Sequence, residues 1–157
     1  MGYTHYFKMD EPLVIMPLQK KLIQEVLKKE NKGGNVLFGA DGTGKPLFND
    51  KEILLNGNAL TDEDHETFGV EFGTKKDFDF CKTARKPYDL AVCKILLVLT
   101  LSKGFNISSD GTNQNDADET YLGDESWPEA LAWFAKKGFQ DTIDKKINPY
   151  LNDAKND

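Results

Sequence analysis

Three stretches of the chain repeat their apolar residues with a helical period. The first, over residues 17–31, carries one apolar stripe, begins with a proline and is followed by two glycines, which predicts an amphipathic helix. The second, over 87–104, is apolar almost all round, so we expect it to be the most buried helix. The third, over 126–137, begins with Ser126 and Glu129 in capping-box spacing. Another helical turn or two is expected within 141–150.

Shorter apolar segments between turn residues predict strands. They cover residues 3–7, 36–38, 52–56, 66–72 and 106–109. With the helices, they predict one α+β domain: a mostly antiparallel sheet of about four to five strands with two or three helices packed on one face. We expect this domain to span residues 1–150, with 151–157 as a frayed tail.

Composition and charge narrow the functional classes. The chain has 157 residues and a formal net charge of −6, which argues against a general binder of DNA or RNA. Cys81 and Cys93 are too few for a disulfide framework, so we expect reduced thiols. The first ten residues lack the pattern of a secretion signal, and no apolar run approaches the roughly 20 residues of a membrane span. These features predict an intracellular protein without a membrane partner.

The segment Gly39–Lys45 has the spacing of a nucleotide-binding phosphate loop. Pro46 follows where such a loop needs a hydroxyl and the start of a helix. We therefore interpret the segment as a glycine-rich connection.

The strongest chemical signal is the run Phe78–Tyr88, just ahead of the expected buried helix. It supplies cations, hydroxyls and helix-start amides, the groups that bind phosphate. Those residues are Lys82, Thr83, Arg85, Lys86 and Tyr88. Phe78, Phe80 and Tyr88 could stack against a base. A solvated basic loop with its aromatic rings in the core is the alternative reading.

Histidine and cysteine side chains offer weaker signals. Strand alternation places Tyr3 and His5 on one face, where His5 could contact a ligand or be a structural residue. His65 lacks the spacing of a metal site. Cys81 lies beside basic residues that favour a thiolate, and a cysteine–histidine pair with either histidine would suit a hydrolase. We expect neither a metal nor a cofactor.

The segment 110–129 contains seven acidic residues and no basic ones. It lacks the spacing of a calcium loop, and a solvated loop is the simpler interpretation. It could instead bind a basic partner protein. Outside it the charges nearly balance, whereas residues 75–86 carry five basic against two acidic side chains.

Four segments resemble a family of small proteins encoded by phages and prophages. They are Gly2–Tyr6, His65–Phe68, Phe80–Asp89 and Ser109–Gly111, and the third, FCKTARKPYD, is the most specific. Members usually begin GYTHYW, and here Phe7 stands where many relatives have tryptophan. The resemblance covers roughly residues 2–111.

That family resembles the phage sponge proteins that inhibit CBASS-type bacterial immunity by sequestering cyclic-nucleotide signals. The resemblance implies an anti-defence protein of the bacterial host cytoplasm that binds a cyclic dinucleotide without catalysis, as a homo-oligomer. The ligand-binding residues would be Tyr3, His5, Lys82, Thr83, Arg85, Lys86 and Tyr88. A nucleotide hydrolase, or an inhibitor that uses the acidic segment, is the alternative.

Overall fold

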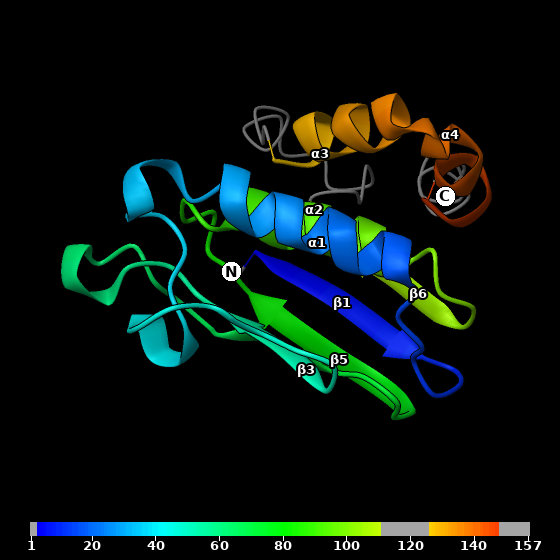
Figure 1. The fold of residues 1–157 in the computed structure, drawn as a ribbon, viewed down its shortest axis with the longest axis horizontal. Helices are drawn as coiled ribbons and strands as arrows, with labels where there is room; N and C mark the ends of the chain where they lie inside the picture. The colour runs from blue at the N-terminus through cyan, green and yellow to red at the C-terminus, as the bar shows by residue number, and fades with distance from the viewer. Residues whose placement is uncertain (1–2, 111–125, 148–157) are drawn as a thin grey trace.

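The computed structural model describes residues 3–110 and 126–147 (Figure 1). The strands are β1 (Thr4–Met9), β2 (Leu47–Phe48), β3 (Glu52–Leu55), β4 (Phe68–Glu71), β5 (Lys76–Lys82) and β6 (Phe105–Ser109). The helices are α1 (Pro17–Lys29), α2 (Asp89–Leu99), α3 (Ser126–Phe134) and α4 (Gln140–Thr142). Wider π-type turns over Ala135–Phe139 and Ile143–Ile147 flank α4.

The strands form two antiparallel three-stranded sheets, in the orders β5–β1–β6 and β2–β3–β4. In the first sheet, His5 of β1 pairs with Cys81 of β5 on one side and with Ser109 of β6 on the other. The predicted single-domain α+β class is confirmed. The strands divide between two small sheets, however, instead of forming one sheet of four to five strands.

The helices lie on one side of the strands, and α3 lies beyond α1 and α2 (Figure 1). Helix α2 contacts both α1 and α3, and all of its residues except Leu90 are buried. This arrangement confirms that the second predicted helix is the most buried. It also explains the apolar sequence of α2, because a helix with neighbours on several sides has no solvent face.

Three predictions about single segments have different outcomes. The segment 36–38 is not a strand, and only Phe38 forms a bridge, to Asn56. The Gly39–Lys45 segment is a connection with one 3₁₀ turn over Ala40–Gly42, and it leads into β2 with no helix after Lys45, as predicted. Strand β5 was not predicted, because its large apolar residues Phe78 and Phe80 point to solvent instead of the core.

Two further predictions fall partly outside the described residues. Residues 111–125 of the acidic segment and residues 148–157, which include the expected tail, are not described. Within the described ranges, no helix is long and apolar enough to cross a membrane.

Candidate functional site

Strand β1 separates two kinds of side chain by simple alternation. His5, Phe7 and Met9 point into the core and are buried. Tyr6 and Lys8 point to the opposite face of the sheet, which the helices do not cover. The face of the sheet that the helices cover thus carries buried His5, and the opposite face is accessible.

The accessible face carries three neighbouring aromatic rings. The Phe78 ring lies 6.0 Å from the Tyr6 ring and 5.9 Å from the Phe80 ring, measured between centroids. Phe78 is 58% exposed and Phe80 is 43% exposed. A hollow of about 160 Å³ lies between Tyr6, Phe78 and the β6 residues Asn106 and Ser108. We call Tyr6, Phe78 and Phe80 the aromatic face.

A cation lies at the end of the aromatic face. Lys82, the last residue of β5, places its ammonium 5.7 Å from the centroid of the Phe80 ring. Its backbone N–H donates to Glu66 at 2.8 Å, and its carbonyl lies 2.7 Å from Nδ1 of His65. The backbone around Lys82 is therefore fixed while its side chain remains half-exposed.

The loop that follows, Thr83–Tyr88, has a strained backbone. Ala84 and Arg85 have positive φ angles of 53° and 57°, in the left-handed region that costs a non-glycine residue roughly 1 kcal/mol. The Lys86 N–H donates to the Thr83 carbonyl at 3.0 Å and closes the turn. Such paired strain persists only where surrounding contacts impose the conformation.

Side chains of the loop make those contacts. The Arg85 guanidinium lies over the ring of buried Tyr3, at 4.2 Å from its centroid. Lys86 donates to the Asp62 carbonyl at 2.9 Å. The buried Tyr88 hydroxyl donates to the Glu66 carbonyl at 2.6 Å, and its burial raises the pKa of the phenol.

A buried polar cluster supports the loop from the core. Asp89, the first residue of α2, accepts hydrogen bonds from His5 Nε2 at 2.6 Å and from the Thr83 hydroxyl. Burial raises the pKa of the Asp89 carboxyl, but the hydrogen bonds from His5, Thr83 and Ser126 outweigh it and leave the pKa below its usual value. The carboxylate therefore stays charged and ties β1, the loop and α3 to the start of α2.

The second nitrogen of His5 faces a serine. Nδ1 lies 2.6 Å from the Ser109 hydroxyl, which also accepts from the Trp127 indole at 3.0 Å. Nδ1 hydrogen-bonds to the Ser109 hydroxyl, which also donates to the Thr4 carbonyl at 3.3 Å. Serine, histidine and aspartate thus form a continuous hydrogen-bonded chain, and all three are buried.

Cys93 completes a group with metal-ligating atoms. Its sulfur, His5 Nε2 and an Asp89 oxygen lie within 4.8 Å of one another, and all three residues are buried. The sulfur lies 3.7 Å from His5 Nε2 and 3.8 Å from Asp89 Oδ2. The short His5–Asp89 hydrogen bond already occupies the position that a cation would take, so the group fits a hydrogen-bonded core better than a metal.

The structure divides the predicted ligand-binding residues into two sets. Lys82, Arg85 and Lys86 have accessible side chains. Tyr3, His5, Thr83 and Tyr88 are buried. His5 and Thr83 bond to Asp89 at the start of α2, and Tyr3 packs against Arg85, so the buried set supports the loop that carries Arg85 and Lys86.

Two weaker candidates have other roles. Burial raises the pKa of the Cys81 thiol, and the nearby acidic groups add to this effect, so the expectation of a favoured thiolate is wrong. The basic residues next to Cys81 in the sequence do not lower the pKa of its thiol, because the Cys81 side chain points into the core and away from them. His65 is exposed and lies against the Lys82 backbone.

Sequence reasoning missed Tyr6 as part of a site. The signal was present, since alternation places Tyr6 on the face opposite to His5. Tyr6 could be identified as part of an aromatic surface only once β5 was known, because the strand register places Tyr6 directly beside Phe80.

Comparisons with protein-family models, with curated proteins and with solved structures find no match for this chain.

Proposed function

We propose that this protein binds a nucleotide on the outer face of the β5–β1–β6 sheet and holds it without changing it chemically. The observation that carries the proposal is the aromatic face, with the Lys82 ammonium at its end on β5. Exposed rings on a sheet surface stack against bases, and neighbouring cations bind the phosphates.

The rings have no structural reason to be exposed. Burying a phenylalanine stabilises a fold by roughly 1.5–3 kcal/mol, and Phe78 at 58% exposed and Phe80 at 43% exposed leave about half of that gain unused. Stacking against a base would bury them in the complex, at about 1–3 kcal/mol per base.

The rigid loop suits a binder without catalysis. A preformed site loses little entropy when a ligand binds, which raises affinity and residence time. The Thr83–Tyr88 loop is held in a strained conformation by three of its side chains, so Arg85 is positioned before a ligand arrives.

The resemblance to phage sponges suggests which nucleotide the protein binds and in which setting. A cyclic dinucleotide offers two bases for the aromatic face and two phosphates for Lys82 and Arg85. We propose that the protein sequesters such a signal in the bacterial cytoplasm during phage infection, as a homo-oligomer.

Isothermal titration with cyclic di-AMP and cyclic di-GMP tests the location of the site. The double variant F78L/F80L keeps apolar side chains but removes the rings, and should weaken binding about tenfold or more. R85Q should weaken it by a similar factor through the loss of a charged hydrogen bond. Circular dichroism checks that each variant is folded.

The matched control is Leu60→Ala. Leu60 is 93% exposed and belongs neither to the aromatic face nor to the Thr83–Tyr88 loop, so its variant should bind like the wild type. If F78L/F80L also binds like the wild type, the aromatic face is not the site.

The Ser109–His5–Asp89 chain favours a second candidate, a hydrolase. Ser109 would attack a phosphodiester phosphorus and expel a ribose oxygen, while Asp89 orients the His5 ring. His5 Nδ1 would take the serine proton and pass it to the leaving oxygen, and water would then cleave the bond between Ser109 and phosphorus. Burial of all three side chains argues against substrate access in this conformation.

The two candidates differ in the fate of the ligand. A hydrolase converts cyclic di-AMP to a linear product, and S109A abolishes the conversion. A binder returns the ligand intact after heat denaturation, and S109A leaves binding within about twofold.

A further inference from the structure

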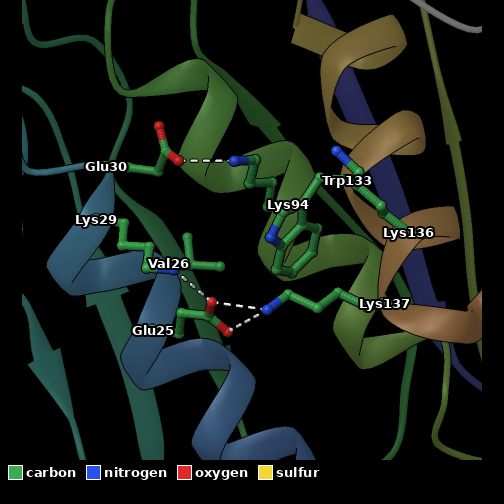
Figure 2. Close-up of a pocket in the computed structure, with 8 residues that line it drawn as sticks. All are labelled: Glu25, Val26, Lys29, Glu30, Lys94, Trp133, Lys136 and Lys137. Carbon is green, nitrogen blue, oxygen red and sulfur yellow. Dashed lines mark hydrogen bonds and ion pairs between the residues drawn. The ribbon is translucent and has the colours of Figure 1, made fainter.

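A pocket of about 320 Å³ opens between α1, α2 and the chain that continues from α3 (Figure 2). Four lysines, two glutamates, one tryptophan and one valine line it. Figure 2 shows the Trp133 ring between Lys94 of α2 and Lys137. The pocket shares no residue with the aromatic face or with the Arg85 loop.

The sequence creates this pocket by placing charged residues where helices face one another. Trp133, Lys136 and Lys137 have the spacing of one helical face. The same spacing relates Val26 and Lys29 of α1 to Glu30, the residue that follows the helix. Facing helices usually meet through apolar side chains. Here long charged side chains meet instead, and they leave a hollow above α2.

Lys94 is the one charged residue on α2 beyond its first residue, and it faces this pocket. Its side chain is 9% exposed, its Nζ lies 2.7 Å from Glu30, and it lies 5.2 Å from the centroid of the Trp133 ring. A buried ion pair stabilises a fold no better than apolar side chains of the same size. Packing alone therefore does not account for a lysine here.

Two of the other lysines, Lys29 and Lys137, bind the carboxylate of Glu25. Lys137 lies 2.7 Å and 3.0 Å from its two carboxylate oxygens, and Lys29 lies 2.9 Å from one of them. The hydrogen bonds from Lys137 and Lys29 lower the pKa of the Glu25 carboxyl. With four lysines and two glutamates, the lining carries an excess of two positive charges. Lys136 makes no ion pair within the described residues.

We infer that this pocket binds a small aromatic anion, a planar ring that carries a phosphate or carboxylate. The ring would contact the half-exposed Trp133 indole, and the anionic group would bind Lys136, which makes no ion pair within the described residues. The volume lies at the lower end of the range for ligand pockets, roughly 300–1,000 Å³, which limits the ligand to a single ring system with a short anionic arm.

Phenyl phosphate titrated into the full chain tests the inference through tryptophan fluorescence. Trp127 is 1% exposed, so Trp133 is the indole that a ligand can reach. We expect saturable quenching that is lost in W133F and retained in F78L/F80L. Phenol and inorganic phosphate, each lacking one half of the probe, should bind at least about tenfold more weakly.

Lysine variants locate the anion. K136Q should weaken phenyl phosphate binding about two- to fivefold, the value of one accessible charged contact, and it breaks no ion pair within the described residues. The matched control K28Q removes an exposed lysine of α1 that does not line the pocket, and should leave affinity unchanged. Equal affinity of K136Q and the wild type, tight binding of phenol, or the absence of saturable quenching would each overturn the inference.

Discussion

Replacing Asp89 with asparagine removes the charge at the centre of the buried cluster while keeping the shape of the side chain. One carboxylate oxygen accepts from both His5 and Thr83, and Ser126 donates to the same group. Hydrogen bonds to a charged partner contribute about 1.5–3 kcal/mol each, and an asparagine retains one weaker acceptor. We expect D89N to lower the free energy of unfolding by about 3 kcal/mol, or the melting temperature by about 6–12 °C for a chain of this size.

The loss should depend on pH in one direction. The pKa of Asp89 is lower in the folded protein than in the unfolded chain, so its stabilisation is complete above the unfolded value of about 3.9. The stabilisation is lost as the pH falls through the folded pKa. The difference between wild type and D89N should therefore be constant near neutral pH and shrink below about pH 4.

Urea denaturation at a series of pH values measures this difference. The matched control is D50N, the same chemical change at a carboxylate that is 88% exposed and paired with Lys20, where less than about 1 kcal/mol is expected. A D89N effect as small as that of D50N, or one that grows toward acid pH, would refute the role assigned to the cluster.

Three further predictions test the loop, the packing around it and the buried thiols. A84G should raise the free energy of unfolding by about 0.5–1 kcal/mol, because glycine adopts the positive φ of 53° without strain; a fall in the melting temperature would contradict this. G57A should destabilise by about 3 kcal/mol or more, because an added Cβ would lie 2.0 Å from the Glu63 carbonyl oxygen, and a melting temperature like that of the wild type would show that the loop there is free to move. Cys81 and Cys93 should react with a thiol reagent only in denaturant, since both are buried, and labelling of the native protein would contradict their placement.

The sequence predicted correctly those elements whose apolar residues lie at the positions that the fold buries. Helix α1 has one apolar stripe and α2 has apolar residues on every side, and each pattern matches the surroundings of the helix. In strand β5 the large apolar side chains are exposed instead of buried: Phe78 and Phe80 face solvent, and Cys81 faces the core. A pattern read for burial therefore could not identify it.

The sequence indicated a candidate segment, but it did not show how the residues of that segment divide between core and surface. The run Phe80–Asp89 stood out by composition, and its cations are accessible as expected. His5 meets Asp89 across 84 positions and Ser109 across 104, so the cluster depends on tertiary contacts that local pattern does not reveal. Burial then makes His5 and Thr83 supports for the loop rather than surface groups.

Native mass spectrometry of the protein incubated with a bacterial nucleotide extract tests the central proposal most directly. The mass added to the folded protein identifies the ligand and its stoichiometry, and denaturation releases that ligand for a second mass. We expect a bound nucleotide whose mass is the same before and after release, and loss of that adduct in F78L/F80L. A protein that takes up no nucleotide, or one that releases a cleaved product, would contradict it.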